Sequence, residues 1–454
     1  MKHHFTSCLN NPRLIMVFLG WAMDYRPFET LSADGYDVMV LWDYRSVALD
    51  AELTDGYQEI VIVAWSFGVP VASLFIAENP SLPVTSRVAV NGTQHPVDNF
   101  RGIPEEIFTA TLDNLSADSL PRFYRRVAGS GAAYRAFMSH VPQRDIDGLR
   151  EELALIASRK AAIVDWDTAY IAENDLIIPT ANQHASWRDE AARIITVSSS
   201  HMPDFNAIIS EAVTDKPLVA ERFGKAMSSY DSNAQVQHEV VRRLVEMWNP
   251  SSDMHPDMIE IGCGTGFSTL TYLDRMTPHS LELWDLVISP DLPENAVKVE
   301  CDAEARLFNT PRCSADVIFT SSTVQWFNSL PAFFRNVSEI LRPGGLLVMS
   351  TFGPDNFREL HTALGTENGY LTKDEISAIL PRTLKVEAAN DEKIVMTFPD
   401  VSAMLRHIRS TGVNALSRSV SAAATRSLMR DYPRTAAGNV ELTYAPIYFI
   451  IKKI

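Results

Sequence analysis

The sequence predicts an α/β protein of two domains, each built on parallel strands and helices, with a doubly wound sheet in the second. With 454 residues, the chain is long enough for two or three domains that each bury a core. Short apolar runs alternate with helical segments in both halves, as they do in sheets with helices on both faces. Two of these runs end in a turn of small residues, one around Ser66 and one around Gly262.

The composition is that of a globular protein from a reducing compartment, and we expect a cytoplasmic location. Hydrophobic residues make up 46% of the chain and charged residues 21%. The four cysteines are scattered without paired spacing, which argues against a disulfide framework or a metal site. A net charge of −16 argues against general nucleic-acid binding. The apolar run Leu14 to Gly20 is too short to span a bilayer, so we expect no membrane segment.

The first half contains a serine in a turn between a strand and a helix. Three apolar runs have the composition of buried parallel strands, namely Leu14 to Leu19, Val38 to Leu41 and Ile60 to Ala64. The third run leads through Ala64-Trp-Ser-Phe-Gly68 into the helical segment Val69 to Glu78. Small residues two positions before and after Ser66 are typical of a nucleophile elbow. The usual first glycine of that motif is Ala64 here, so a purely structural serine is the alternative.

Two later loops carry the partners that a catalytic serine needs. Asp175 follows a strand end, and His201 lies in a loop after a further strand. The chain order Ser66, Asp175, His201 is that of the α/β-hydrolases. His201 would take the serine proton, and Asp175 would fix the tautomer of the imidazole and stabilise its charged form. Asp24 and Asp165 are weaker candidates for the acid, and a turn cap or a surface loop residue is the alternative role for Asp175 and His201.

The same reasoning assigns an oxyanion hole. Its first donor would be the backbone N–H of Phe67, which follows the serine. The second would come from the loop after the first strand, where we assign the N–H of Trp21.

A helical insertion is predicted between the catalytic elements, from Thr109 to Arg159. Positions 122 to 144 contain no acidic residue, although the rest of this half is strongly acidic. This stretch carries the arginines Arg122, Arg125, Arg126, Arg135 and Arg144. We interpret the local reversal of charge as a surface for an acidic partner, and a solvated helix face is the alternative.

Several short motifs of the first half occur together. They are Phe18-Leu-Gly-Trp-Ala-Met-Asp24, Pro27-Phe28, Trp65-Ser-Phe-Gly68, Phe123-Tyr-Arg-Arg126, and Asn182-Gln183 with Ala185 to Trp187 after Pro179. In combination they resemble the pimeloyl-[acyl-carrier protein] methyl ester esterases of biotin synthesis, over most of residues 12 to 206. The resemblance implies a serine hydrolase of the α/β-hydrolase fold that meets acyl carrier protein. Ala22 and Val127-Ala128 depart from the family pattern, which puts fine substrate preference in doubt.

A short linker is expected where the two halves join. Glu211 to Pro217 is polar, contains a proline and has no apolar periodicity. A boundary near residue 214 gives domains of residues 1–213 and 214–454, and both lengths are normal for a domain.

The second half is organised around Met258-Ile-Glu-Ile-Gly-Cys-Gly-Thr-Gly-Phe267. Gly262, Gly264 and Gly266 lack the Cβ atoms that would keep the backbone away from a ligand, and the helix that follows presents free N–H groups. The spacing Gly-x-Gly-x-Gly differs from that of dinucleotide folds and phosphate loops. Because Glu260 would repel a phosphate, the expected ligand is a nucleoside without phosphates, and we expect Glu260 and the three glycines to bind it.

Acidic residues at the ends of the next strands are placed to bind such a nucleoside. Asp285 ends the run from Leu281 and would accept hydrogen bonds from the ribose hydroxyls, with Glu282 as the alternative. Asp302 follows the third strand and would accept from the adenine amino group. For Asp285 and Asp302, an ordinary loop acid is the alternative. Further strands are expected at 316–320 and within 340–349, and helices from Glu221 to Trp248 would cover the pocket.

The second half also resembles a known family. Glu260-x-Gly-x-Gly-x-Gly matches the first motif of class I S-adenosylmethionine methyltransferases. The further motifs are Ala220-Glu-Arg-Phe223, Val324-Gln-Trp326, Met404-Leu-Arg-His407, Thr411-Gly-Val-Asn414 and Leu442-Thr-Tyr444. From about residue 216 to the end, the chain looks like malonyl-[acyl-carrier protein] O-methyltransferase. The resemblance implies a Rossmann-like fold, S-adenosylmethionine as methyl donor, and malonyl-acyl carrier protein as acceptor. Candidates for the wall of the acceptor pocket are Tyr230, Gln325, Trp326 and Arg406.

Together, the two resemblances imply a fusion of two enzymes that act at opposite ends of one pathway. The C-terminal domain would methylate the malonyl carboxylate, which is already ionised and needs alignment rather than a general base. The N-terminal domain would later hydrolyse the methyl ester of the pimeloyl chain, and both would meet the acidic carrier. One alternative is a methyltransferase and an esterase of other substrates. Another is an N-terminal half that has lost catalysis and only docks the carrier.

Overall fold

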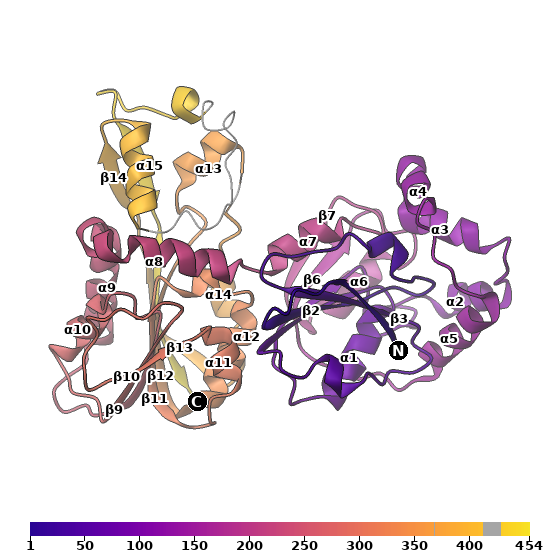
Figure 1. The fold of residues 1–454 in the computed structure, drawn as a ribbon, viewed down its shortest axis with the longest axis horizontal. Helices are drawn as coiled ribbons and strands as arrows, with labels where there is room; N and C mark the ends of the chain where they lie inside the picture. Colours follow the sequence, from indigo (N-terminus) through magenta and orange to yellow (C-terminus); the bar gives the residue numbers. More distant parts are fainter. Residues whose placement is uncertain (367, 412–427) are drawn as a thin grey trace. The chain divides into compact units, whose positions relative to one another are not determined.

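The protein is described by a computed structural model that covers residues 1–366, 368–411 and 428–454. The chain divides into two compact units, Met1–Val213 and Thr214–Ile454. Each unit contains a seven-stranded sheet of its own (Figure 1). In the described ranges, no helix combines the length and apolar character needed to cross a membrane.

The first unit is built on a sheet whose strands are parallel except at one edge. The strands are β1 (Lys2–Ser7), β2 (Arg13–Phe18), β3 (Asp37–Trp42), β4 (Glu59–Trp65), β5 (Val84–Val90), β6 (Trp166–Ala172) and β7 (Ala191–Val197). Their order is β1-β3-β2-β4-β5-β6-β7, and β1 alone pairs antiparallel within this sheet. β3 and β4 bury every side chain, because packed segments cover both faces of the sheet. These are the continuous apolar runs that the sequence shows.

Helices of the first unit surround this sheet and form the insertion. They are α1 (Gly68–Glu78), α2 (Glu105–Asp113), α3 (Leu120–Ala128), α4 (Gly131–Met138), α5 (Ile146–Ser158), α6 (Thr180–Trp187) and α7 (Phe205–Ala212), with short 3₁₀ turns η1 (Arg26–Phe28) and η2 (Ala51–Leu53). α2 to α5 lie between β5 and β6 in the sequence, so the predicted helical insertion is present and begins at Glu105.

The expected linker is shorter than the sequence suggested. α7 continues to Ala212, and the first helix of the second unit begins at Lys216. Pro217 does not stop that helix, because proline is tolerated in a first turn, where its missing N–H has no partner to lose. The side chain of Asp215 caps the helix by accepting from the N–H of Leu218 at 3.1 Å.

The second unit is built on a mixed sheet with a switch in strand order. Its strands are β8 (Asp257–Ile261), β9 (Ser280–Asp285), β10 (Val297–Glu300), β11 (Ala315–Ser321), β12 (Leu341–Phe352), β13 (Leu384–Asp391) and β16 (Pro446–Lys453). The order is β10-β9-β8-β11-β12-β16-β13, with β16 antiparallel to both of its neighbours. The order reverses between β8 and β11, and a crevice at such a point is the usual ligand site of this architecture.

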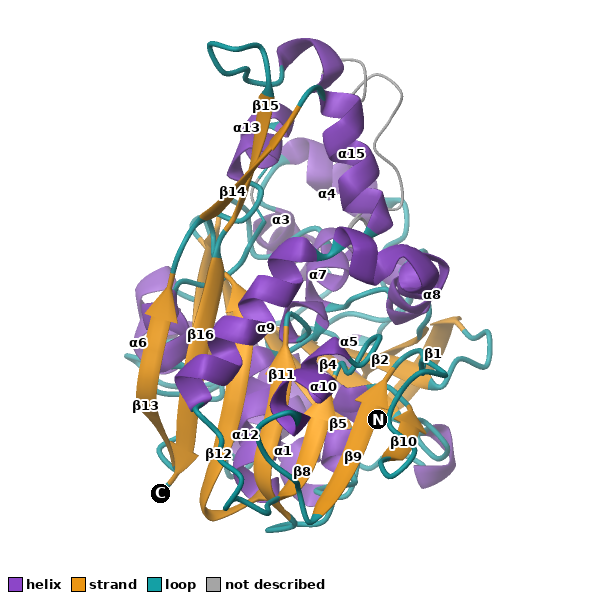
Figure 2. Ribbon diagram, turned by 90° about the vertical axis from the view of Figure 1, so that its left-hand side faces the viewer, coloured by secondary structure: helices purple, strands orange, loops and turns teal. Residues whose placement is uncertain are grey.

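Helices cover both faces of the second sheet. They are α8 (Lys216–Asn233), α9 (Gln235–Trp248), α10 (Phe267–Leu273), α11 (Ala303–Phe308), α12 (Leu330–Ile340), α13 (Arg358–Leu364), α14 (Lys373–Ala378) and α15 (Val401–Ser410), with the 3₁₀ turn η3 (Val324–Trp326). α9 and α10 lie on the face turned toward the viewer in Figure 2. A second pair of strands, β14 (Ile394–Phe398) and β15 (Val440–Tyr444), lies with α13 and α15 beyond the carboxyl ends of the sheet (Figures 1 and 2).

Candidate active sites

Ser66 stands in a sharp turn at the carboxyl end of β4. Its φ angle of +57° lies in the left-handed region, which non-glycine residues adopt mainly where the surrounding structure forces them. The chain packs closely around this turn. A Cβ atom on Gly68 would lie 2.2 Å from the carbonyl oxygen of Phe18, and one on Gly92 would lie 2.5 Å from that of Ser66. The small residues therefore permit the strained turn, with Ala64 accepted at the position where the motif usually has glycine.

The serine, the histidine and the acid predicted from chain order meet in one chain of hydrogen bonds. Nε2 of His201 lies 3.0 Å from Oγ of Ser66, and Nδ1 of the same ring lies 2.8 Å from Oδ2 of Asp175. His201 is only 1% exposed. Burial by itself raises the pKa of Asp175, but the neighbouring His201 and the backbone N–H groups of Ile177 and Ile178 outweigh burial and lower it overall. The carboxylate is therefore held in its charged form beside the imidazole.

The two alternative acids lie in other surroundings. Asp24 accepts from the side chain of Arg26 and from the N–H of Gln143. The carbonyl oxygen of Asp165 accepts from Arg87. The ring of His201 is hydrogen-bonded to Asp175, so the structure favours Asp175 over both alternatives.

Sequence reasoning gave no role to a buried glutamine that also holds the acid. Nε2 of Gln183 donates to Oδ2 of Asp175 at 2.7 Å and to the carbonyl oxygen of Ile178 at 3.1 Å. Gln183 is fully buried on α6, eight residues after the acid. The carbonyl oxygen of His201 is held in a similar way, because it accepts from the indole N–H of Trp65 at 2.8 Å. These contacts fix the carboxylate of Asp175 and the backbone of His201, and only the fold brings these residues together.

A mainly apolar cavity opens beside Ser66. Besides the serine, its walls are Trp21, Phe67, Ile103, Ile107, Phe108, Thr111, Phe123, Arg126, Leu153 and Ile177. Residues of α2 and α3 supply one side, so the helical insertion covers the serine. The two residues assigned to the oxyanion hole, Trp21 and Phe67, both line this space. The indole N–H of Trp21 donates to the carbonyl oxygen of Leu149 at 3.0 Å, which ties the loop after β2 to α5.

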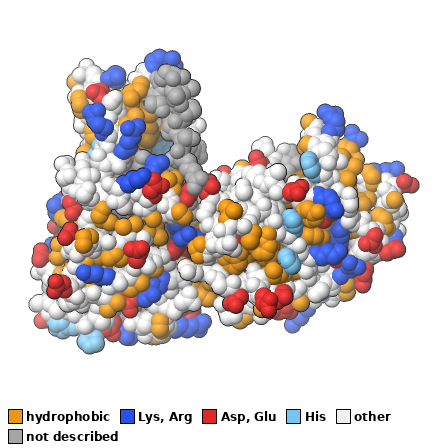
Figure 3. Space-filling view, viewed as in Figure 1, with side chains coloured by type: hydrophobic (Ala, Val, Ile, Leu, Met, Phe, Trp, Pro, Cys, Tyr) orange, Lys and Arg blue, Asp and Glu red, His pale blue; other side chains and the backbone are white. Residues whose placement is uncertain are grey.

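The arginine-rich stretch separates into two parts. Arg122, Arg125, Arg126 and Arg135 are exposed on α3 and α4, and basic side chains are visible at that end of the first unit in Figure 3. Arg126 also lines the cavity beside the serine. Arg144 does not belong to this surface, because its side chain is 6% exposed and pairs with Glu152 at 2.8 Å. Charge along the sequence could not separate a buried ion pair from an exposed basic face.

In the second unit, the glycine loop brings backbone close to a cavity. Gly262, Gly264 and Gly266 all have positive φ angles, of +77°, +53° and +91°. A Cβ atom on Gly262 would lie 2.0 Å from Oγ1 of Thr323, whereas one on Gly264 would meet nothing within 4 Å. Gly264 therefore leaves open space beside the loop, and Gly262 allows contact between the loops after β8 and β11. Gly266 is the N-cap of α10 and does not line the cavity.

Glu260 lies behind the glycine loop, so the expectation that it binds the ligand is not met in the structure. Its side chain is buried and accepts hydrogen bonds from the hydroxyls of Ser268, Thr269 and Tyr272 on α10, the last two at 2.6 and 2.7 Å. Burial raises the pKa of Glu260 despite these donors. The residue therefore fixes α10 against β8 and acts on the loop only indirectly.

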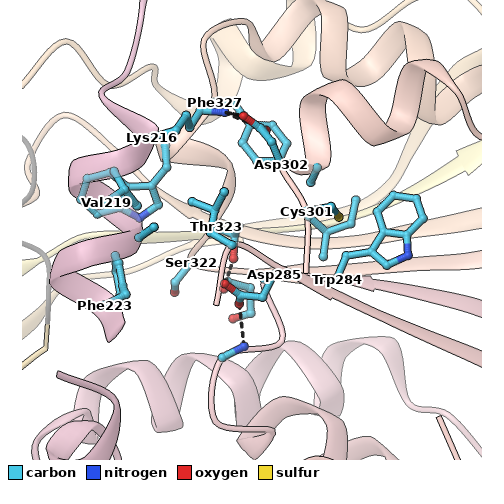
Figure 4. A pocket seen from close by; sticks show the side chains of 18 of the residues that line it. Lys216, Val219, Phe223, Trp284, Asp285, Cys301, Asp302, Ser322, Thr323 and Phe327 are labelled. Carbon is cyan, nitrogen blue, oxygen red and sulfur yellow. Dashed lines mark hydrogen bonds and ion pairs between the residues drawn. The ribbon is translucent and has the colours of Figure 1, made fainter. Parts of the chain in front are cut away.

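The cavity of the second unit lies at the reversal of strand order. α8 supplies one wall, and the ends of β9, β10 and β11 supply the others. Figure 4 shows Asp285 and Thr323 between Val219 and Phe223 of α8 on one side and Trp284 on the other. Oδ2 of Asp285 accepts from the N–H of Gly264 at 2.8 Å, and burial raises the pKa of this carboxyl. The carboxylate thus braces the glycine loop at the edge of the cavity.

Asp302 lines the cavity, but both of its oxygens already have a partner. Nζ of Lys216 lies 3.0 and 3.2 Å from them and 2.7 Å from Oε2 of Glu304. The side chain of Lys216 is 2% exposed. The sequence predicts that this lysine lies in the linker, where a charged residue is normally solvated. It is instead the first residue of α8, and it fixes the start of that helix to the floor of the cavity (Figure 4).

The remaining candidates divide between the cavity and its surroundings. Tyr230 and Trp326 line the cavity. Gln325 donates to the carbonyl oxygen of Ser322 at 2.7 Å behind the wall, and Arg406 is exposed on α15 and is not part of the lining. Glu282 also lies outside the lining and pairs with Arg306 at 3.1 Å, which favours Asp285 over it as the carboxylate of the site. Of the motif that starts at Thr411, Gly412 to Asn414 lie outside the described residues.

Comparison with known proteins identifies both units. A family model described as pimeloyl-ACP methyl esterase BioG matches residues 1–208, and one described as a methyltransferase domain matches residues 232–390. The malonyl-[acyl-carrier protein] O-methyltransferase of Bacteroides fragilis is 33% identical over 457 residues, which cover 97% of this chain and 92% of that protein. The chain belongs to the malonyl-[acyl-carrier protein] O-methyltransferase family. The predicted fusion of such a methyltransferase with an esterase domain, and the predicted fold class, are confirmed.

A further relative and a solved structure each match part of the chain. The enzyme of that name from Bacteroides thetaiotaomicron is 31% identical and covers 53% of this chain and 98% of its own. A crystal structure of BioG from Haemophilus influenzae is 31% identical, covers 44% of this chain and 94% of its own, and has a TM-score of 0.41.

Proposed function

We propose that this protein is a bifunctional enzyme of biotin synthesis. The second unit methylates the free carboxylate of malonyl-acyl carrier protein with S-adenosylmethionine, and the first unit hydrolyses the methyl ester of pimeloyl-acyl carrier protein. The observation that carries the proposal is the unbroken hydrogen-bond chain from Ser66 through His201 to Asp175, in a chain that matches a malonyl-[acyl-carrier protein] O-methyltransferase over 97% of its residues. A module that merely docks the carrier would not need this arrangement.

Hydrolysis in the first unit follows from the positions of three side chains. Oγ of Ser66 attacks the ester carbonyl while Nε2 of His201 accepts its proton. His201 then returns the proton to the leaving methoxide, which departs as methanol, and Asp175 stabilises the charged imidazole throughout. A water molecule, deprotonated in turn by His201, releases the acyl chain from the serine. The backbone N–H groups of Phe67 and Trp21 would stabilise the oxyanion, since both residues stand beside the serine.

The residues of the second cavity fit a nucleoside methyl donor. Gly264 has space where a side chain would stand, and Asp285 offers a carboxylate for ribose hydroxyls. The carboxylate of Asp302 would accept a hydrogen bond from the adenine amino group while it also accepts from Nζ of Lys216. When bound, the donor supplies an electrophilic methyl group on a sulfonium.

The protein then has to align the acceptor and exclude water. A carboxylate is ionised at neutral pH, so its oxygen would need no general base to take the methyl group, and the electrons of the C–S bond would remain with the sulfur of the donor. Phe223, Tyr230 and Trp326 form an aromatic wall along this cavity, which favours a dry site.

Intact-mass measurement of both carrier substrates tests the proposed function. When S-adenosylmethionine is present, the mass of malonyl-acyl carrier protein should rise by one CH₂ unit. The mass of methyl pimeloyl-acyl carrier protein should fall by one CH₂ unit even when S-adenosylmethionine is left out. Methylation of unrelated small acids, with the malonyl carrier left unchanged, would favour a methyltransferase of another substrate. Methylation without any ester hydrolysis would favour the carrier-docking alternative for the first unit.

The exposed arginines should affect binding of the carrier protein and not cleavage of the ester bond. Replacing Arg122, Arg125 and Arg135 by glutamate should lower kcat/KM for the carrier-bound ester roughly tenfold or more at low salt, because the carrier is acidic and opposite charge speeds association. Hydrolysis of methyl pimelate, which has no carrier, should be unchanged. Arg126 is left in place because it lines the catalytic cavity.

The matched control is Arg188→Glu, an exposed arginine of the same unit outside the insertion. This variant should hydrolyse the carrier-bound ester and methyl pimelate at the same rates as the native protein. An equal loss on the carrier-bound and the small ester after the triple replacement would contradict a docking role for this surface.

A further inference from the structure

The loop after β11 brings two buried polar groups to the wall of the methyltransferase cavity without a hydrogen-bond partner. Oγ of Ser322 and Nε1 of Trp326 are both inaccessible and have no partner in the part of the chain that the structure describes. Trp326 is 6% exposed, and its indole N–H can only donate. Buried donors nearly always have an acceptor, so an N–H without one, in a residue that lines the cavity, marks a place where a ligand could supply the acceptor.

The position of Ser322 is fixed by its surroundings. Its φ angle of +54° is rare for a residue with a side chain. Its N–H donates to the carbonyl oxygen of Ser350 at 3.1 Å, and its own carbonyl oxygen accepts from Gln325 at 2.7 Å. A strained residue that is held from both sides is characteristic of a functional position. In Figure 4 the side chain of Ser322 lies between Phe223 and Asp285.

The charges around this cavity do not favour an anionic substrate. Its described lining carries the carboxylates Asp285 and Asp302 and one cation, Lys216. Lys216 lies between Asp302 and Glu304, so its charge is already matched within the protein. Arg406 is exposed and stands outside the lining. A carboxylate that enters this cavity therefore needs a positive charge from another source.

We propose that the hydroxyl of Ser322 and the indole N–H of Trp326 hold the acceptor carboxylate, and that the bound methyl donor supplies the opposite charge. This inference rests on the proposed methyltransferase function and extends it to the order of binding. The malonyl group binds well only after the donor. The Ser322 hydroxyl and the Trp326 indole N–H are uncharged, so they orient the acceptor carboxylate without neutralising it. The carboxylate therefore keeps its nucleophilicity. After transfer, the ester and the spent donor are both neutral, and the attraction that held the acceptor ends.

Calorimetric binding of malonyl-pantetheine tests this order. The native protein is first saturated with sinefungin, which carries an ammonium group in place of the sulfonium, or with S-adenosylhomocysteine, which is neutral at that position. Malonyl-pantetheine should bind at least tenfold more tightly to the sinefungin complex. The methyl ester of malonyl-pantetheine, which lacks the charge, should bind equally to both complexes.

Two variants test the assigned donors. Ser322→Ala and Trp326→Phe should each weaken malonyl-pantetheine binding to the sinefungin complex at least fivefold, while the affinity for sinefungin itself stays within twofold. The matched control is Trp248→Phe. That indole N–H is also buried without a described partner, but it lies in the core against Tyr272 and Phe319 and not at the cavity. Its loss should leave malonyl-pantetheine binding unchanged.

Three results would overturn the inference. Equal affinity of malonyl-pantetheine for the two complexes would mean that the protein supplies the positive charge. The same conclusion would follow if Arg406→Ala weakened malonyl-pantetheine binding while Ser322→Ala and Trp326→Phe left it unchanged. If the native protein methylates malonyl-acyl carrier protein while either result holds, only the inference fails. Absence of both binding and methylation would overturn the proposed function together with it.

Discussion

Replacing Ser66 by alanine should abolish hydrolysis of methyl pimeloyl-acyl carrier protein and leave methylation of malonyl-acyl carrier protein intact. The variant keeps His201 and Asp175 but has no oxygen 3.0 Å from Nε2 to attack the ester. Loss of the nucleophile from a triad that acts as a unit costs on the order of 10³-fold or more in kcat. The measurement is the intact mass of the carrier after incubation with native protein or variant.

Stability should change little in this variant, because alanine meets the same backbone constraint at φ +57° as serine does. Ser81→Ala, at an exposed serine beyond α1, is the control for a serine lost elsewhere in the unit. If Ser66→Ala hydrolysed the ester at the native rate, another group would be the nucleophile. If the native protein also failed, the first unit would act as a docking module.

The buried parallel strands were predictable because they are apolar along their whole length. β3 and β4 differ from the predicted runs by one residue at each end, since strands covered on both faces need no polar side. β1 and β13 gave no such signal. β1 begins with Lys2 and two histidines at the antiparallel edge, and in β13 only Leu384 is buried, while the residues after it are half-buried or exposed. Their pairing is determined by distant parts of the chain, which a local pattern cannot report.

The candidate sites, like the strands, were predictable where the signal is local in the sequence and not where it depends on distant residues. Ser66, Asp175 and His201 were found because each has a local context, and their chain order is characteristic. Lys216 was missed because its partner Asp302 lies 86 residues away in the sequence. Glu260 was assigned to the ligand because a motif gives spacing but not direction, and its side chain turns toward the hydroxyls of α10 instead.

Replacing Gly262 by alanine should remove methyl transfer almost completely. A Cβ atom there would lie 2.0 Å from Oγ1 and 2.7 Å from Cβ of Thr323, so the loop after β11 has to move away. That loop carries Ser322 and Trp326, and the glycine loop itself lines the cavity, so one methyl group disturbs both sides of the site. A displacement near 1 Å can cost on the order of 100-fold in rate, and affinity for the donor should fall with it. Methyl transfer and calorimetric binding of S-adenosylhomocysteine measure the two effects.

Backbone strain has to be separated from this collision, and the chain offers a matched position. Gly344 has nearly the same φ angle, +82° against +77°, but a Cβ atom there meets nothing within 4 Å. Gly344→Ala should therefore cost only the strain of a left-handed alanine, about 1 kcal/mol of stability, and leave methyl transfer unchanged. A similar loss of methyl transfer in both variants would attribute the effect of Gly262→Ala to backbone conformation. If only Gly262→Ala loses methyl transfer, the loss is due to the collision with Thr323. The close contact of Gly262 with Thr323 would then be what positions the loop after β8 against the loop after β11.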